Sequence, residues 1–342
     1  MTDLFEKSIH TLELPRVLEL LADQAVTEEG KQRCLALRPM TDAGDVRRAQ
    51  AETTAAVTMM TVRGTPSFSG VKPVRASLQR ADMGGSLNTR ELLEIAAVLR
   101  AARSAKDYGE GGEGAKSCID HLFRSLTANR FLEEEIADAA SPELAAIRRH
   151  IRSTASKVRD ILNRLLSSNQ AKYLQEAIIT QRNDRFVVPV KSEHKNDVPG
   201  LVHDVSSSGS TFFIEPMGVV KANNELKELQ AREEKEIERI LAELSAECAA
   251  HKEDLAQDYD LLLLLDGIFA RAKLSYRMRA CEPKITERDV YLHRARHPLL
   301  DADKAVANDL MLGETFDTLV ITGPNSGGKT VTRFPWNSNF LN

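Results

Sequence analysis

Aromatic residues and cysteines are scarce in this chain of 342 residues, and both scarcities narrow the choice of fold. Phe, Trp and Tyr make up 5% of the sequence, whereas Asp, Glu, Lys and Arg make up 28%. That balance disfavours β-sandwiches and barrels and favours long helices with solvated faces. The four cysteines lie far apart without a C-x-x-C pair, which argues against zinc sites and disulfides: Cys34, Cys118, Cys248 and Cys281.

The chain also lacks a long hydrophobic run and a strong net charge. Its longest leucine run, residues 261–265, ends at Asp266, far short of the roughly 20 residues of a membrane span. No basic segment followed by an apolar one opens the chain, so we expect a soluble, cytoplasmic protein without a signal peptide. The net charge of -4 gives no overall attraction to polyanions, so nucleic-acid binding would need a local basic patch.

The apolar pattern predicts mostly helix. Several short helices are expected in the first third of the chain, with Thr41 or Asp42 as the candidate N-cap of one and Asn88 or Thr89 as that of another. Residues 142–180 have no internal Gly or Pro and predict one long helix. A helical pattern resumes after Pro216 and Gly218 and continues to about residue 280, broken only by Gly267. Two long helices with apolar faces predict a hairpin in which they pack together.

Between these helices the period changes to that of strands. Residues 185–190, 200–205 and 211–214 are rich in β-branched and aromatic residues and predict three short strands. The predicted fold class is therefore mainly α, with a helical core, a long two-helix lever hairpin, a small β clamp at its tip and the start of an α/β P-loop domain. The corresponding domain ranges are 1–130 for the core, 131–182 and 218–281 for the lever helices, 183–217 for the clamp and 282–342 for the P-loop domain.

Charge differs between the two arms of the hairpin. Residues 151–196 hold 9 Lys or Arg and 4 acids, a balance of +5, whereas residues 221–260 hold 6 and 12, a balance of -6. Concentrated basic charge is typical of contact with a nucleic-acid backbone. The candidate DNA contacts are Arg182, Arg185, Lys191 and Lys195. The alternative is that opposite charges on the two packed helices simply pair.

Other polar groups of the hairpin have simpler interpretations. His194 and His203 lack ligand-spaced partners and are expected to be surface residues. The serine-rich segment 206–210 has no nucleophile motif around it and is interpreted as a turn or a phosphate-contacting loop. The acidic run is expected to be a solvated helix face: Glu233, Glu234, Glu236 and Glu238.

Near its end the chain fits the phosphate-loop spacing G-x-x-x-x-G-K-[ST], and the apolar run 318–322 before it predicts a buried strand. In such a loop, backbone N–H groups surround the phosphates, the lysine reaches the outer phosphates and the threonine hydroxyl binds Mg²⁺. The predicted ligands are therefore ATP or ADP with Mg²⁺. The nucleotide-binding candidates are Gly323, Pro324, Asn325, Ser326, Gly327, Gly328, Lys329 and Thr330, with Thr330 as the Mg²⁺ contact.

Around this loop the chain resembles the MutS family of ABC-type ATPases. The family elements R-H-P, V-x-N-D and T-G-P-N-x-G-G-K-[ST] stand here in order at residues 296–298, 306–309 and 322–330. The resemblance covers nearly the whole chain and is greatest to the MutS-two branch, which lacks a mismatch-reading domain. Phe213-Ile214-Glu215 matches that domain's F-x-E motif but lies in a predicted clamp strand, so we interpret the match as a coincidence.

The resemblance implies a function in DNA repair and recombination. It implies a homodimer whose ATPase heads pair on nucleotide and close the lever arms around branched or recombining DNA, suppressing recombination. It also implies that Val306 and Asn308 line the adenine pocket, although Val306 fits a core position too. His297 fits either a nucleotide contact or a cap for the turn before Pro298. Relatives with an aromatic that stacks on adenine have it at the position of Ala305.

Enzyme activity stays open at this stage. The family's Walker B strand, signature motif and nuclease-like domain have no counterpart after Thr330, so we expect a chain cut just after the Walker A loop. The alternative function is a non-enzymatic arm that binds nucleic acid or stalled ribosomes. A coiled-coil ATPase of the SMC type is disfavoured because those proteins carry the phosphate loop near the N-terminus.

Overall fold

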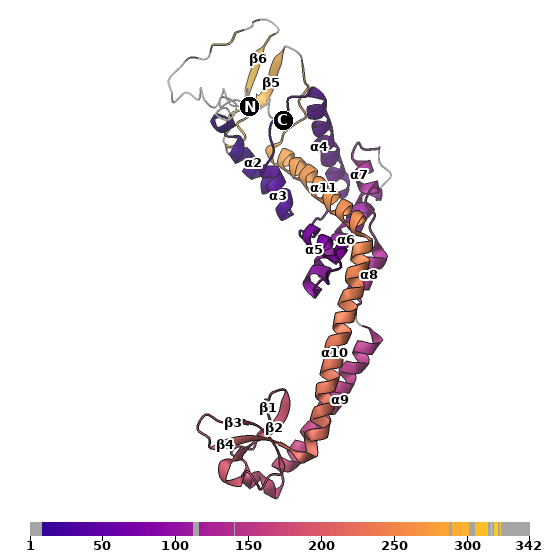
Figure 1. The fold of residues 1–342 in the computed structure, drawn as a ribbon. Helices are drawn as coiled ribbons and strands as arrows, with labels where there is room; N and C mark the ends of the chain where they lie inside the picture. The colour runs from indigo at the N-terminus through magenta and orange to yellow at the C-terminus, as the bar shows by residue number, and fades with distance from the viewer. Residues whose placement is uncertain are drawn as a thin grey trace. The chain divides into compact units, whose positions relative to one another are not determined.

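The structure, a computed structural model, describes residues 9–111, 116–139, 141–286, 289–300, 305–313, 316, 318–320 and 322. It is mainly helical, as predicted, and it contains two small antiparallel sheets (Figure 1). The chain divides into two compact units, of which unit 1 comprises Met1–Ala137 with Ala246–Asn342 and unit 2 comprises Asp138–Ser245. Within the described ranges, every helix is too short or too polar to cross a membrane.

Unit 1 is built mainly from helices. Their bounds are α2 (Leu14–Ala22), α3 (Glu28–Leu35), α4 (Ala43–Arg63), α5 (Arg75–Asp82), α6 (Thr89–Glu110), α7 (Asp120–Arg124), α8 (Arg130–Ala137) and α11 (Lys252–Met278). Of the candidate N-caps, Asp42 and Asn88 occupy the cap positions. The Asp42 side chain accepts the Asp45 N–H, and Asn88 forms a reciprocal capping box with Glu91.

Helix α11 is the centre of unit 1, and it carries two buried carboxylates. Asp266 accepts the backbone N–H groups of Val26 and Thr27 at 2.8–3.1 Å and the Thr27 hydroxyl at 2.7 Å. Asp258 accepts the N–H groups of Thr127 and Ala128 at 2.7 and 3.1 Å. Because burial in apolar surroundings is costly for an unpaired carboxylate, these bonds fix both loops against α11.

Unit 2 contains helix α9 (Pro142–Leu166), the 3₁₀ helix η1 (Asn169–Tyr173) and most of helix α10 (Met217–Ala250). The predicted helix over residues 142–180 was wrong in its second half. Ser167 caps α9, and the Ser168 side chain accepts the Gln170 N–H. Such local side-chain bonds compete with the helical ladder and end it here without Gly or Pro.

A four-stranded antiparallel sheet joins α9 to α10. Its strands are β1 (Thr180–Arg182), β2 (Arg185–Lys191), β3 (Gly200–Val205) and β4 (Thr211–Pro216), in the order β1-β2-β4-β3, with the 3₁₀ helix η2 (Ser192–His194) after β2. The three predicted strands are confirmed, and β1, only three residues long, was missed. We call residues 169–216 the β unit.

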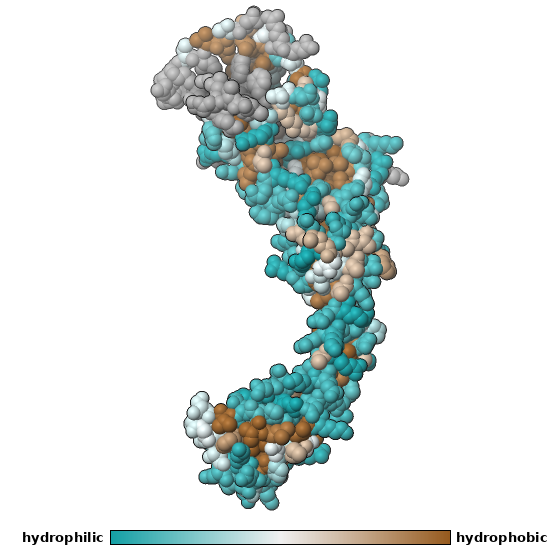
Figure 2. Space-filling model, in the orientation of Figure 1, coloured by the Kyte–Doolittle hydropathy of each residue, from teal (hydrophilic) through white to brown (hydrophobic). Residues whose placement is uncertain are grey.

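One face of this sheet forms a core with the helices. Val188 of β2 pairs with Ile214 of β4, and both are buried against α9 and α10. The helix residues in this core are Val158, Leu162, Val219 and Leu226. Figure 2 shows hydrophilic surface along α9 and α10 and hydrophobic surface over the strands, where exposed Leu201, Val202 and Val205 lie on β3.

Helices α9 and α10 are also joined by charged side chains. Arg148 binds Glu233 at 2.6 Å and His150 lies 3.1 Å from Glu225, so some opposite charges do pair as the alternative interpretation held. Glu236 is buried, which corrects the prediction that the whole acidic run is solvated. Its carboxylate accepts the Ser141 hydroxyl at 2.7 Å and two Arg239 bonds at 2.7 and 2.9 Å, which connects the cap of α9 to α10.

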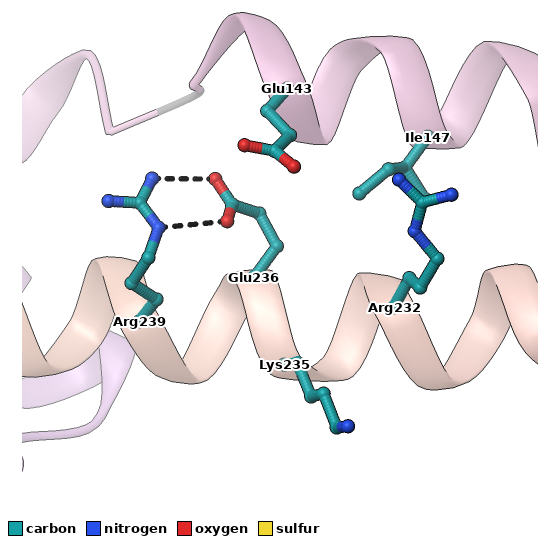
Figure 3. Close-up of a pocket in the computed structure, with 6 residues that line it drawn as sticks. All are labelled: Glu143, Ile147, Arg232, Lys235, Glu236 and Arg239. Carbon is teal, nitrogen blue, oxygen red and sulfur yellow. Dashed lines mark hydrogen bonds and ion pairs between the residues drawn. The ribbon is translucent and has the colours of Figure 1, made fainter.

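The Glu236 contact lies beside a small hollow of about 230 Å³ between these helices. Figure 3 shows the Glu236 carboxylate facing Arg239, with Glu143 of α9 above it and Lys235 turned away. The hollow is lined by Glu143, Ile147, Arg232, Lys235, Glu236 and Arg239. Since both acids and bases line it, it is a site of internal pairing and offers no uniform charge to a ligand.

Acid should weaken the contact between α9 and α10. Hydrogen bonds from Arg239 and Ser141 lower the pKa of Glu236 from 4.5 to about 2. A carboxyl whose folded pKa is depressed contributes stability above its unfolded pKa and loses it as pH falls toward its folded pKa. We expect the stability difference between wild type and Glu236→Gln to be constant above pH 5 and to shrink between pH 4.5 and 2.

Thermal melts followed by circular dichroism over that pH range measure this difference. Glu238→Gln, on the exposed part of the same run, is the matched control. A difference that stays constant through pH 3 would show that Glu236 does not titrate with folding.

Two further strands, β5 (Val290–Ala295) and β6 (Asn308–Leu312), form an antiparallel pair in unit 1. The predicted buried strand over 318–322 is not found in its described residues, Thr318, Leu319, Val320 and Thr322. Val320 is 74% exposed. A buried parallel strand needs neighbours on both sides, and the described ranges supply none for this segment.

Candidate nucleic-acid interface

The aromatic rings of unit 2 share an unusual environment. Unit 2 has four aromatic residues, and a cationic group lies over each ring at 4.2–5.8 Å from its centroid. The pairs are Arg159 with Phe186, Lys172 with Tyr173, Arg182 with Phe213, and Lys195 with Phe212. Cation–π attraction favours these positions of the positive groups, but at an exposed site it is weak and does not lock a long side chain in place.

Arg185 is committed to the interior of the β unit. Its guanidinium binds both oxygens of Glu215 at 2.9 and 3.1 Å and the Asn224 side chain at 2.6 Å. The Glu215 side chain is fully buried. It also lies 2.6 Å from His203 Nε2 and accepts a bond from Asn223 at 2.8 Å. Glu215 thus joins β2, β3 and α10 through one carboxylate.

This cluster corrects one prediction and bears on another. His203, expected on the surface, is half-buried with a carboxylate partner. Glu215, the last residue of the F-x-E match, has no exposed surface, which fits the interpretation that the match is a coincidence. Arg185 and His203 stand 30 and 12 residues before Glu215 in the sequence, too far for spacing to predict these contacts.

Arg182 is also paired, although nearer the surface. Its Nε lies 3.2 Å from Asp204 Oδ2, and its guanidinium lies 4.2 Å from the centre of the Phe213 ring. A further bond reaches the Gln181 carbonyl at 2.8 Å. A paired guanidinium can still meet a phosphate, but part of its charge is already compensated by Asp204.

The two predicted lysines keep their charge available. Lys191 Nζ donates to the Lys172 carbonyl at 3.3 Å, and Lys195 Nζ lies 4.7 Å from the Phe212 ring centre. Neither lysine, nor Lys172, has a carboxylate partner among the described residues. Lys172 contributes to the basic excess of the sequence, but the apolar pattern predicts it inside a long helix, whereas α9 ends at Leu166.

The serine-rich segment forms the turn predicted for it. The Ser206 carbonyl accepts the Gly209 N–H at 2.8 Å, and Gly209 adopts a positive φ of 70° that suits glycine. Ser208 and Ser210 share a hydroxyl contact of 2.7 Å. The Ser210 carbonyl accepts the Ser192 N–H at 3.0 Å, which places this turn next to the end of β2.

The nucleotide-binding candidates are only partly visible. Residues 323–330, including Lys329 and Thr330, lie outside the described residues. Val306 is 77% exposed and so does not belong to the core, while Asn308 begins β6 opposite Ala295. The described structure therefore leaves the adenine pocket as a prediction.

His297 fits a turn-capping role. Its Nδ1 accepts the Leu299 N–H at 3.2 Å, and its Nε2 lies 3.9 Å from Glu13. Burial lowers the pKa of His297, an effect that Glu13 partly opposes. A neutral imidazole can accept the N–H bond that caps this turn.

The sequence comparisons agree with the elements quoted above. Proteins named endonuclease MutS2 from Ruminiclostridium cellulolyticum and Lachnoclostridium phytofermentans are 43% and 44% identical over 96% of this chain. One from Geobacillus sp. is 42% identical over 95% of it. The chain belongs to the MutS family. Within that family it belongs to the MutS2 branch.

No family model matches the chain. The chain spans 43% or 44% of the length of the relatives named above. The activity, substrates and partners of these longer proteins are therefore proposals for this chain.

Proposed function

We propose that this chain is the nucleic-acid-holding part of a DNA-binding ATPase of the MutS2 type. Nucleotide and Mg²⁺, bound at Lys329 and Thr330, would pair the ATPase heads of two copies of the protein. This pairing would control whether the lever arms close around branched or recombining DNA. Such a clamp would suppress recombination in the cytoplasm. The relatives are named endonucleases, and we include DNA cleavage only as an activity of the whole protein.

The observation that carries the proposal is the state of the lysines on the β unit. Lys172, Lys191 and Lys195 are held at the end of a small sheet and have no carboxylate partner among the described residues. Ammonium groups recognise phosphates as point charges without reading bases. The surface thus suits binding to a nucleic-acid backbone with little sequence preference.

Removing the lysine charges should weaken DNA binding and its salt dependence. All four predicted contacts stay in the proposal, but Arg185 is the least available of them because it pairs with Glu215, and Arg185→Ala would also disturb that buried cluster. The cleaner variant is Lys191→Ala with Lys195→Ala. With about 0.9 log unit of salt slope for each phosphate contact, this variant should flatten the log–log slope by about 1.8. Fluorescence anisotropy with a branched DNA over a salt series measures it.

The control removes the same charge from another surface. Lys227→Ala with Lys235→Ala changes two exposed lysines of α10 and should leave the slope unchanged. Equal slopes for wild type and the Lys191/Lys195 variant would show that these two lysines do not contact DNA.

Nucleotide binding should depend on Lys329. In a phosphate loop this lysine meets the outer phosphates, so Lys329→Ala should abolish the ATP or ADP binding that calorimetry detects. Lys304→Ala, outside the loop, is the matched control. Equal heats from wild type and Lys329→Ala would place the nucleotide at another site.

A second candidate function uses the same lysines. Because ammonium groups do not distinguish DNA from RNA phosphates, the β unit also fits an arm that binds RNA or a stalled ribosome without ATPase activity. Competition of bound DNA by purified ribosomes, at fixed salt, separates the two functions.

A further inference from the structure

Two rings and three lysines lie together along one edge of the β unit. The Tyr173 and His194 ring centres are 4.8 Å apart, and Lys172 Nζ lies 4.9 Å from the Tyr173 ring centre on η1. Lys191, at the end of β2, donates to the Lys172 carbonyl, and Lys195 directly follows His194. We call the five residues Lys172, Tyr173, Lys191, His194 and Lys195 the aromatic–lysine edge.

The aromatic–lysine edge is anchored to the hydrophobic core of the β unit. Tyr173 packs against the hydrophobic core of the β unit, and Leu174 bridges to Val190 of β2. His194 is fixed by Asp197, whose carboxylate lies 2.8 Å from Nδ1, while Glu193 lies 3.7 Å from Nε2. These two carboxylates orient the imidazole and leave the three lysines unpaired. The rings therefore have fixed positions, whereas the exposed lysine heads remain free to move.

Positive charge interleaved with aromatic rings is the combination that single-stranded nucleic acids require. Bases of a single strand stack on aromatic side chains while cationic groups follow its phosphates, and stacking needs no particular base. A base in a duplex is already stacked between its neighbours and does not present its face. Lys172 is exposed on a flexible stem, so it can leave the Tyr173 ring to a base and move to a phosphate.

We infer that the aromatic–lysine edge binds an unpaired nucleic-acid strand, with a base stacked on Tyr173 and its phosphates on Lys191 and Lys195. This inference rests on the proposed nucleic-acid function and makes it more specific. Branched DNA contains strands that leave a duplex, so the edge would favour branch points over plain duplex.

The test compares a labelled oligo-dT of about 16 nucleotides with a blunt duplex of the same length, by anisotropy at one salt concentration. Tyr173→Leu keeps an apolar side chain for the core but removes the stacking ring. It should weaken oligo-dT binding about tenfold and leave duplex binding unchanged. Tyr173→Phe keeps the ring and should bind oligo-dT as wild type does.

A photochemical measurement on unaltered protein covers the case in which Tyr173→Leu fails to fold. Oligo-dU carrying a photoreactive halogen on its bases crosslinks to aromatic side chains that stack on them. Mass spectrometry should find the crosslink at Tyr173 or His194. Crosslinks confined to other residues, or equal loss of single-strand and duplex binding in Tyr173→Leu, would overturn the inference.

These outcomes are separable from failure of the proposed function. Wild type that binds neither oligo-dT nor duplex would remove the nucleic-acid function itself. Wild type that binds both, with Tyr173→Leu unchanged on both, would leave that function standing and remove only the stacking site.

Discussion

Replacing Asp266 with alanine is expected to lower the free energy of unfolding of unit 1 by about 3 kcal/mol. The side chain is fully buried and accepts hydrogen bonds from two backbone N–H groups and one hydroxyl. Without it, these donors are left unsatisfied away from water, which is more costly than the loss of an exposed bond. The midpoint of thermal unfolding should fall by about 6–12 °C.

Two further variants make this prediction specific. Asp260→Ala removes an exposed carboxylate of the same helix, which pairs with Arg33 and Arg75, and should cost under about 1 kcal/mol. Gly30→Ala should act like Asp266→Ala, because a Cβ there would lie 2.4 Å from Thr27 Oγ1 and 2.6 Å from Asp266 Oδ2. If Asp266→Ala and Asp260→Ala unfolded at the same midpoint temperature, the buried Asp266 carboxylate would not be stabilising the contact between α3 and α11.

The second large effect is expected at Glu215. Glu215→Ala removes the buried partner of Arg185 and should destabilise the β unit by about 3–5 kcal/mol, because the guanidinium is left uncompensated. Hydrogen exchange should accelerate at the amides of β2 and β4 and remain unchanged in α11. Glu193→Ala, whose side chain is 74% exposed, is the matched control.

A double substitution tests the cause of that loss. Replacing Arg185 and Glu215 together with apolar side chains, as in Arg185→Met with Glu215→Leu, removes the buried charge from both partners. The double variant should recover part of the stability that Glu215→Ala loses. A double variant less stable than Glu215→Ala would mean that His203 and Asn223, and not Arg185, set the cost.

Local signals in the sequence were reliable where a single segment decides the structure. The strands β2, β3 and β4 follow from alternating β-branched and aromatic residues, and the caps at Asp42 and Asn88 follow from side chains that reach backbone three residues on. The sequence does not reveal the end of α9, because it depends on a hydrogen bond from the Gln170 N–H to the Ser168 side chain. No composition rule separates such a serine from one inside a helix.

The candidate site was harder to predict because its chemistry depends on partners far along the chain. Arg185 and Lys191 look alike as basic residues of one strand, yet one is neutralised by Glu215 and the other is not. Tyr173 gave no signal, since its neighbours His194 and Lys191 come close only when η1 lies beside the end of β2. The excess of basic residues predicts a nucleic-acid-binding surface. Ion pairs with carboxylates decide which of its cations remain available to bind phosphates.

The two buried aspartates of α11 have a consequence for sequence drift. Asp258 and Asp266 bind the main chain of their loops, so at Val26 and Ala128 they require only a backbone N–H. Almost any side chain satisfies that requirement, and proline, which lacks the N–H, does not. Ala128 adds a second restriction, because its φ of 52° favours glycine or asparagine as replacements. Val26 can thus change widely while its docking point on α11 stays the same, whereas Ala128 cannot.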